Sequence, residues 1–130
     1  MPVHTLPADT DRLRSALKTL THEAAESNRY LVVCYCAQWC DTCREYAHGF
    51  ADLAQQWPQH IFVWVDIEES PELLGDEDVE NFPTLLVQSD GKNLFFGPML
   101  PHIGHLDKLL ETAHRMPPTS NGPPPLTTLI

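Results

Sequence analysis

Hydrophobic residues recur along the chain at two spacings, which predict helices and strands in turn. In residues 10–27 they follow the helical period, and Asp9 or Thr10 is placed to cap the first turn. The run 31–36 has no charge and is rich in β-branched and aromatic residues, as is typical of a strand buried on both faces. We therefore expect a helix that leads into a central strand.

The same pattern continues beyond this strand. From Cys43 onward hydrophobic residues mark one face of a long helix that Pro58 ends, and residues 61–67 form a second buried strand. A strand, helix and strand in this order imply a right-handed crossover between two parallel strands. The predicted fold class is α/β.

The second half of the chain should complete the sheet. Ser70 and Pro71 predict the start of a short helix that continues to about Val79. Residues 84–88 and 93–96 flank an Asp-Gly turn and predict a hairpin of two antiparallel strands.

The hydrophobic pattern resumes once more before the C-terminus. A last helix is expected from about residue 103 to 114. The proline-rich residues 116–130 are expected to bury no core and to form a flexible tail. This divides the chain into one domain, residues 1–115, and a tail, residues 116–130.

Length and charge narrow the function. The 130 residues are the size of one domain, and 18 acidic against 8 basic residues give a net charge of −10, which argues against binding nucleic acid or an anionic membrane. No apolar run approaches the roughly 20 residues that span a bilayer. The start of the chain lacks the features of a secretory signal, so a cytoplasmic location is expected. No phosphate loop or nucleotide fingerprint is present, and no cofactor is expected.

One stretch of the chain is strongly acidic. Residues 66–80 contain eight carboxylates and no Lys or Arg. Such a stretch is either a solvated face or a docking surface for basic proteins.

All four cysteines, Cys34, Cys36, Cys40 and Cys43, lie within ten residues. Cys40 and Cys43 are three residues apart where the buried strand turns into a helix, so their sulfurs can form a small disulfide ring. The N-terminus of that helix favours a thiolate at Cys40. Taken alone, this pair fits redox chemistry and half of a zinc site equally well.

The surrounding motifs resemble those of one family. Trp39-Cys40-Asp41-Thr42-Cys43 after a buried strand, and Phe82-Pro83-Thr84 just before a hairpin, are similar to the thioredoxin family over roughly residues 5–115. The resemblance implies a thioredoxin fold, with a central mixed sheet of four to five strands flanked by about four helices. It also implies a thiol–disulfide oxidoreductase that acts on protein disulfides, with an unidentified electron donor, and we expect a monomer.

The resemblance also assigns roles to residues. Cys40 would be the exposed attacking thiol and Cys43 the buried resolving thiol, and together they would form the redox disulfide. The substrate-binding positions that it implies are Trp39, Phe82, the cis-proline Pro83 and Gly97, which would lie in a substrate-facing loop.

Several positions depart from the family pattern. The pair between the cysteines is Asp41-Thr42 rather than Gly-Pro, so the reduction potential cannot be transferred. Thioredoxins also use a buried Asp and a Lys to handle the proton of the resolving thiol, and the matching positions here are Cys34 and Trp64. Water or another group would have to take over that proton.

Cys34 and Cys36 alternate along one strand and therefore face the same side, below the helix of the active site. Three interpretations remain open: two small buried hydrophobic residues with protonated thiols, a relay in which Cys34 receives the disulfide from Cys43, or a metal site of four cysteines. Two alternatives to the enzyme also remain, namely an interaction module with little redox turnover and a metal-binding protein.

Overall fold

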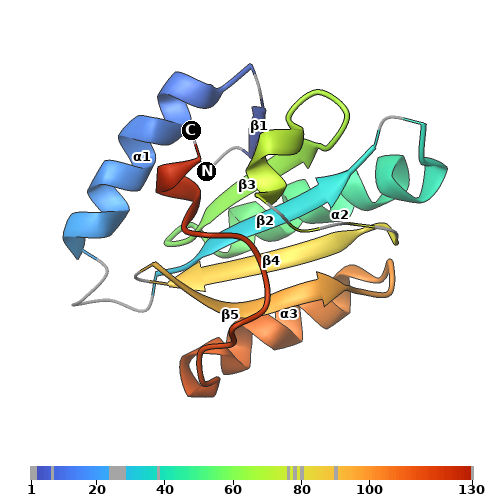
Figure 1. Cartoon of the computed structure of the whole chain (residues 1–130). Helices are drawn as coiled ribbons and strands as arrows, with labels where there is room; N and C mark the ends of the chain where they lie inside the picture. Colours follow the sequence, from blue (N-terminus) through green and yellow to red (C-terminus); the bar gives the residue numbers. More distant parts are fainter. Residues whose placement is uncertain are drawn as a thin grey trace.

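The computed structural model describes residues 3–6, 8–23, 29–37, 39–75, 77, 79, 81–89 and 91–129. Its centre is one sheet with the strand order β1-β3-β2-β4-β5 (Figure 1). The strands are β1 (His4–Leu6), β2 (Leu31–Cys36), β3 (Ile61–Asp66), β4 (Thr84–Ser89) and β5 (Lys92–Pro98).

The sheet is mixed. Strands β1 and β2 run parallel to β3, β4 is antiparallel to β2, and β5 is antiparallel to β4. All six residues of β2 are buried, which confirms the expectation of a central strand. The parallel pair β2 and β3 joined through a helix confirms the α/β class.

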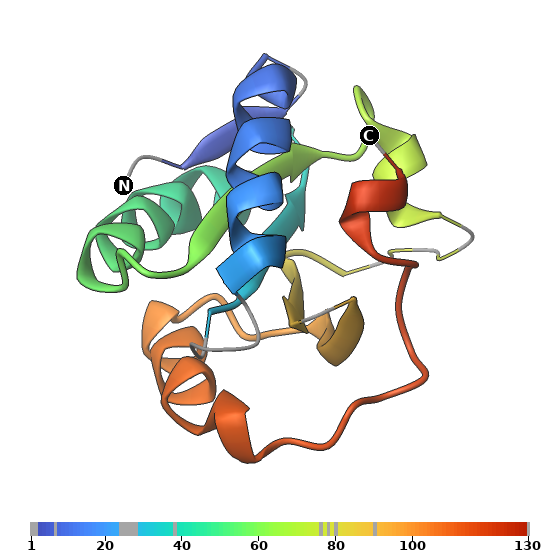
Figure 2. The same cartoon turned by 90° about the vertical axis from the view of Figure 1, so that its left-hand side faces the viewer.

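Helices cover both faces of the sheet. The α-helices are α1 (Thr10–Glu23), α2 (Asp41–Gln56) and α3 (Ile103–Thr112), and the 3-10 helices are η1 (Pro71–Leu74), η2 (Ala113–Arg115) and η3 (Leu126–Thr128). Helices α2 and α3 lie on one face, whereas α1, η1 and η3 lie on the other (Figures 1 and 2). The sheet therefore separates two hydrophobic cores.

Two elements differ from expectation, and the end of a third lies outside the described residues. Strand β1 was not predicted, because three residues are too few to show a period of two. The prediction of a helix that continues to Val79 is wrong: η1 ends at Leu74, because the φ of +60° at Gly75 does not continue a right-handed helix. Helix α1 is described to Glu23, and residues 24–27 of its expected range lie outside the described residues.

The C-terminal segment packs on the molecule. It crosses the sheet from α3 to the side of α1 (Figure 2), and Leu126 is only 1% exposed in the second core. The buried side chain of Gln88 accepts a hydrogen bond from the Leu126 N–H (3.1 Å) and donates to the carbonyl of Pro124 (3.1 Å). The expectation that this segment buries no core is wrong for Leu126, because the core beside β4 receives this residue, which follows the prolines.

Within the part of the chain that the structure describes, none of the helices is both long and apolar enough to cross a membrane.

Candidate active site at the start of helix α2

The end of β2 and the start of α2 bring two cysteines together. Cys40 is the N-cap residue of α2, with an extended backbone, and its sulfur accepts a hydrogen bond from the Cys43 N–H at 3.4 Å. Cys40 is partly exposed, whereas Cys43 in the first turn is only 1% exposed. This difference follows from the turn itself, because position 43 faces the sheet and position 40 lies at the tip.

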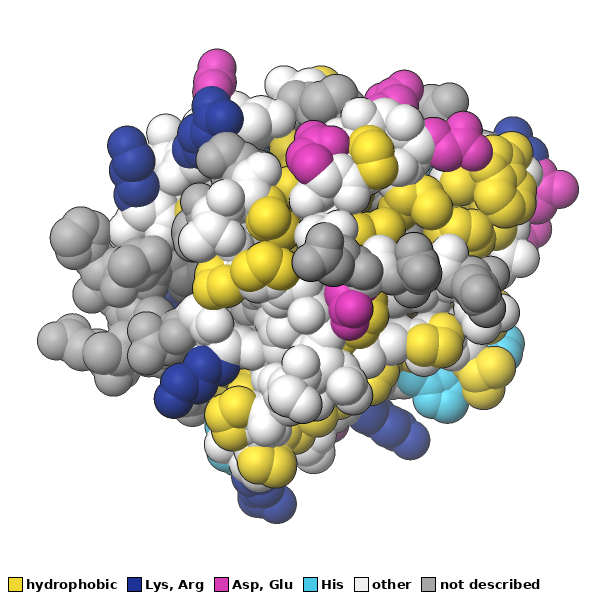
Figure 3. Space-filling view, in the orientation of Figure 1, with side chains coloured by type: hydrophobic (Ala, Val, Ile, Leu, Met, Phe, Trp, Pro, Cys, Tyr) yellow, Lys and Arg dark blue, Asp and Glu magenta, His cyan; other side chains and the backbone are white. Residues whose placement is uncertain are grey.

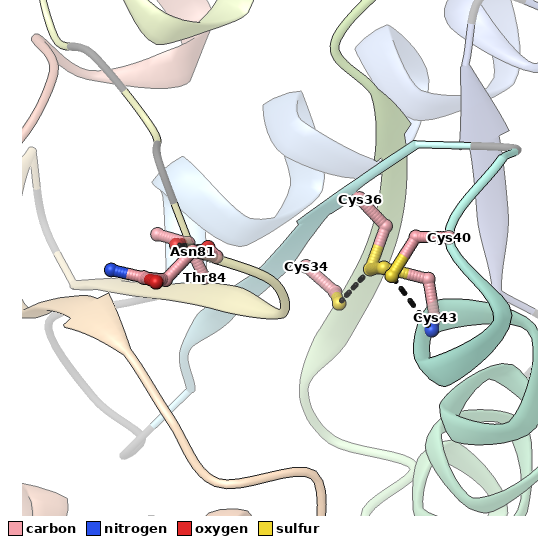
Figure 4. The surroundings of a disulfide bond; sticks show 6 residues. All are labelled: Cys34, Cys36, Cys40, Cys43, Asn81 and Thr84. Carbon is pink, nitrogen blue, oxygen red and sulfur yellow. Dashed lines mark hydrogen bonds between the residues drawn. A yellow bond between two sulfur atoms is a disulfide. The ribbon is translucent and has the colours of Figure 1, made fainter.

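The disulfide in this structure joins Cys43 to Cys36, and Cys40 and Cys34 are free (Figure 4). The pairing present is therefore not the expected one between Cys40 and Cys43, which remains a prediction. The physical reason is the packing of α2 on the last residue of β2, which brings the Cα atoms of Cys36 and Cys43 to 5.9 Å. That separation is normal for a disulfide.

Cys34 extends the group of sulfur atoms along the strand. Its Sγ lies 3.7 Å from the Sγ of Cys36, and both face the core that α2 covers. Burial raises the pKa of the Cys34 thiol well above its ordinary value, so it remains protonated near neutral pH. The interpretation of both strand cysteines as protonated thiols is wrong for Cys36, which is oxidised here.

Tyr46 of α2 lies in the same core as these cysteines. Its hydroxyl is buried and has no hydrogen-bond partner among the described residues. Burial raises the pKa of Tyr46, and the nearby Cys34 adds to the shift. Cys34 and Tyr46 thus lie in a poorly solvated environment.

An aromatic pair adjoins the exposed thiol. Trp39 is 63% exposed, its ring centroid lies 5.5 Å from that of Phe82 in an edge-on arrangement, and its Nε1 donates to the Glu68 carboxylate. Figure 3 shows hydrophobic side chains gathered at the end of the molecule where β2 runs into α2. This end offers an apolar surface next to Cys40.

The Phe82–Pro83 peptide bond is cis and lies at the start of β4. The Pro83 carbonyl accepts a hydrogen bond from the Met99 N–H at 3.1 Å, and the Thr84 hydroxyl donates to the Asn81 carbonyl at 2.7 Å (Figure 4). Both bonds tie this segment to its surroundings.

Gly97 lies within β5, opposite Leu85, rather than in a loop. The hairpin pairing thereby places it close to the segment of Pro83.

The positions of the family's buried Asp and Lys face one another. Cys34 on β2 is paired in register with Trp64 on β3, and neither side chain is a strong base. A pocket of about 540 Å³ lies beside them, lined by Ala37, Cys43, Arg44, Ala47, His48 and Trp64. Solvent therefore comes close to Cys43.

Asp41, between the cysteines, is exposed and forms an ion pair with Arg44 one turn along α2. Its charge is therefore compensated at the surface and screened by solvent.

Among the residues that the structure describes, no three or more His, Cys, Asp or Glu side chains are arranged to hold a metal ion. Three carboxylates of the acidic stretch that were expected to be solvated or to dock a partner make internal bonds, and Glu68, which accepts from Trp39, is one of them. Asp66 accepts the Glu68 N–H at 2.9 Å, and Glu77 accepts the Gly122 N–H at 2.9 Å.

Sequence reasoning missed Cys36 as the partner of Cys43. The signal that could have found it is the alternation along β2, which places Cys36 at the last position of the strand on the face below α2.

Fold and site together define a class of protein, in which a disulfide centre lies where the central parallel strand runs into a helix, beside a cis-proline. Residues 14–97, well over half of the chain, match the family model described as Thioredoxin. The chain belongs to the thioredoxin family, and the fold is the thioredoxin fold, as the motifs implied.

Plant thioredoxins are among the similar sequences. The chain is 36% identical to thioredoxin H5 of Oryza sativa over 72 residues, which cover 55% of this chain and 53% of that protein. It is 38% identical to thioredoxin H1 of Arabidopsis thaliana over 72 residues, covering 55% and 63%. The chain thus spans about half to two thirds of the length of these relatives.

Solved structures show the same fold. The Fasciola hepatica thioredoxin has a TM-score of 0.60 at 29% identity, with 79% of this chain and 93% of that chain covered. A mutant of a poplar thioredoxin h has a TM-score of 0.71 at 18% identity, covering 92% and 88%.

Proposed function

We propose that this protein is a thiol–disulfide oxidoreductase that exchanges disulfides of protein substrates through Cys40. One observation carries the proposal: Cys40 is a free, partly exposed thiol at the N-cap of α2, and its sulfur accepts the Cys43 N–H. A helix N-terminus and a donated N–H both stabilise a thiolate, which is the attacking species.

The cycle has two exchanges. The Cys40 thiolate attacks a substrate disulfide, forms a mixed disulfide and releases one substrate thiolate. The Cys43 thiol then gives up its proton and attacks the Cys40 sulfur, which releases the second substrate thiol and leaves a Cys40–Cys43 disulfide. Two electrons pass from the protein to the substrate.

Cys43 must be reduced before it can resolve a substrate, so a donor has to open the Cys36–Cys43 disulfide found in this structure. A dithiol donor would deliver two electrons and restore both thiols. Such a donor belongs to a reducing compartment, and we place the activity in the cytoplasm.

Protein substrates would lie across the surface of Trp39 and Phe82, next to Pro83 and Gly97. The exposed indole supports this assignment, because an aromatic ring that is 63% exposed provides apolar contact area to a partner. An extended substrate segment would pair with the backbone around Phe82 and thereby hold its disulfide against Cys40.

The proton of Cys43 would leave through solvent. The pocket that Cys43 shares with His48 and Trp64 supports this route, because no carboxylate occupies the position of Cys34. A slower resolving step than in a protein with a buried carboxylate follows from this proposal.

The working unit would be the domain of residues 1–115, acting as a monomer. Because Leu126 packs in the second core, the tail would stabilise this unit without taking part in the exchange.

Reduction of insulin by dithiothreitol tests the proposal. We expect the wild-type protein to accelerate insulin precipitation and Cys40→Ser to return the rate to background, since the attacking sulfur is lost. Cys34→Ala is the control, because it removes another cysteine of the same group that takes no part in the two exchanges, and it should remain active. A wild-type rate equal to background, or full activity in Cys40→Ser, would exclude the enzyme and favour the interaction module.

A further inference from the structure

Three cysteines, rather than two, meet at the junction between β2 and α2. Cys43 lies between two sulfur partners: Cys36, to which it is bonded, and Cys40, whose sulfur accepts its backbone N–H at 3.4 Å (Figure 4). A sulfur atom that lies near two cysteines can exchange one partner for the other by thiol–disulfide exchange.

We propose that Cys36 is a third redox cysteine. After a substrate has been reduced, Cys36 replaces Cys40 as the disulfide partner of Cys43. This inference rests on the proposed function, because that function generates the Cys40–Cys43 disulfide from which the exchange starts. Its product is the disulfide present in this structure, with Cys40 restored as a free thiol.

The exchange is an internal rearrangement. The Cys36 thiol loses its proton and attacks the Cys43 sulfur; the bond between Cys40 and Cys43 breaks as the bond between Cys36 and Cys43 forms. The electron pair of the broken bond leaves with the Cys40 sulfur as a thiolate, which takes up a proton from solvent to become a thiol. One disulfide and one thiol are present before and after, so no oxidant or reductant is needed.

The surroundings favour this direction. The leaving Cys40 sulfur is at the helix N-terminus, accepts an N–H and is partly exposed, so it can carry charge. The attacking Cys36 sulfur has the Cys34 sulfur at 3.7 Å, from which it can accept a hydrogen bond when it ionises. Cys34 itself stays protonated because burial raises its pKa, so it can donate this hydrogen bond.

The consequence is a change in how Cys40 behaves. While Cys43 is held by Cys36, Cys40 has no resolving partner, although it can still attack a substrate disulfide. A mixed disulfide formed in this state would persist until a donor opens the buried Cys36–Cys43 bond. The protein would then alternate between a dithiol that turns over and a single thiol that retains its partner.

Native alkylation distinguishes the two pairings. The protein is first reduced completely and then oxidised with one equivalent of diamide. At successive times after the oxidation, samples are treated with N-ethylmaleimide without denaturant. The mass of the intact protein then gives the number of labels. Cys34 and Cys36 are 0% and 1% exposed, so a label reports Cys40. The Cys40–Cys43 pairing gives no label and the Cys36–Cys43 pairing gives one.

We expect labelling of the wild type to rise from none to one per molecule as the exchange proceeds. Cys36→Ala should remain unlabelled. Cys34→Ala, from the same face of the same strand, keeps the attacking Cys36 and loses only its hydrogen bond, so it should still reach one label, at a lower rate. Cleavage after Tyr35 and Trp39 and before Asp41 separates the four cysteines, so linked peptides identify each pairing.

An oxidised wild type that stays unlabelled, or that is fully labelled from the first time with no Cys40–Cys43 peptides, would overturn the relay. Labelling of folded Cys36→Ala would also overturn it. If Cys36→Ala does not fold, the time course of the wild type decides. Failure of the proposed function is seen separately, as insulin reduction that does not depend on Cys40.

Discussion

The indole ring of Trp39 lies edge-on against the phenyl ring of Phe82, with their centroids 5.5 Å apart. The two residues are 43 positions apart in the chain and come from the two segments that flank the proposed exchange site. Their contact joins the loop before α2 to the loop before β4, so a single apolar surface adjoins Cys40.

Trp39→Ala should weaken the use of protein substrates. Loss of one aromatic contact of about 1 kcal/mol predicts a fall of about fivefold in kcat/KM for insulin. Reduction of hydroxyethyl disulfide, which is too small to cover the surface, should change by less than about twofold. Leu100→Ala is the control, because Leu100 is another exposed hydrophobic residue, with 65% of its surface accessible. An equal fall with both substrates would indicate that Trp39 acts on Cys40 itself.

Asp41→Asn should have little effect on the reactivity of Cys40. The carboxylate is exposed and paired with Arg44, so solvent and its partner screen its charge. We expect the rate of Cys40 alkylation by iodoacetamide at pH 7 in the reduced protein to change by less than about threefold. A tenfold change would show that this charge governs the thiol in spite of its exposure.

Leu126→Ala should destabilise the whole domain. A buried leucine replaced by alanine costs about 3 kcal/mol, and Leu126 is 1% exposed in the second core. Urea unfolding followed by tryptophan fluorescence would measure this loss, with Leu100→Ala as the exposed control. A change in the free energy of unfolding below about 0.5 kcal/mol would mean that Leu126 is not packed in the second core in solution.

His60 should make the protein less stable as the pH falls. Its Nδ1 accepts the Tyr30 N–H at 3.0 Å, its ring stacks on Trp57, and its buried Nε2 has no partner among the described residues. Burial, assisted by Arg29, lowers the pKa of His60 from 6.5 to about 4. Below pH 6.5, His60 therefore binds a proton in the unfolded chain but not in the folded chain.

The stabilisation should be complete above pH 6.5 and decline as the pH falls toward 4. Between pH 7.5 and 5.5 the free energy of unfolding should fall by about 1 kcal/mol because of His60. His60→Asn, which keeps an acceptor for the Tyr30 N–H, should remove most of this slope. His4, whose pKa is lowered by burial, contributes in the same direction and remains in both proteins. An unchanged slope in His60→Asn would contradict the assignment.

Much of the architecture was predictable because it depends on local patterns. The uncharged run of β2 and the helical period of α2 predict how each element is buried. The Asp-Gly pair in the sequence predicts the hairpin of β4 and β5. The sites that failed prediction are those where the local pattern is short or interrupted. Strand β1 has three residues, and η1 ends at Leu74, where Gly75 and the acidic residues after it interrupt the hydrophobic pattern.

The C-terminal segment shows the limit of composition as a guide. Five prolines and few hydrophobic residues in 116–130 favour an extended chain without a core of its own. What holds the segment is a surface elsewhere in the molecule, namely Gln88 of β4 and the pocket that receives Leu126. A composition rule describes what a segment can bury by itself and says nothing of what another part of the chain provides.

For the cysteines too, the sequence determined some relationships and the packing of the fold determined others. The sequence by itself determined that Cys40 and Cys43 lie one helical turn apart at a strand-to-helix junction and that Cys34 and Cys36 share a face of the strand. Only the tertiary structure decided that Cys36 bonds to Cys43, because that pairing depends on how closely α2 packs on the end of β2. Spacing along a chain sets which side chains share a face, whereas the distance between two elements is set by the packing of all the side chains between them.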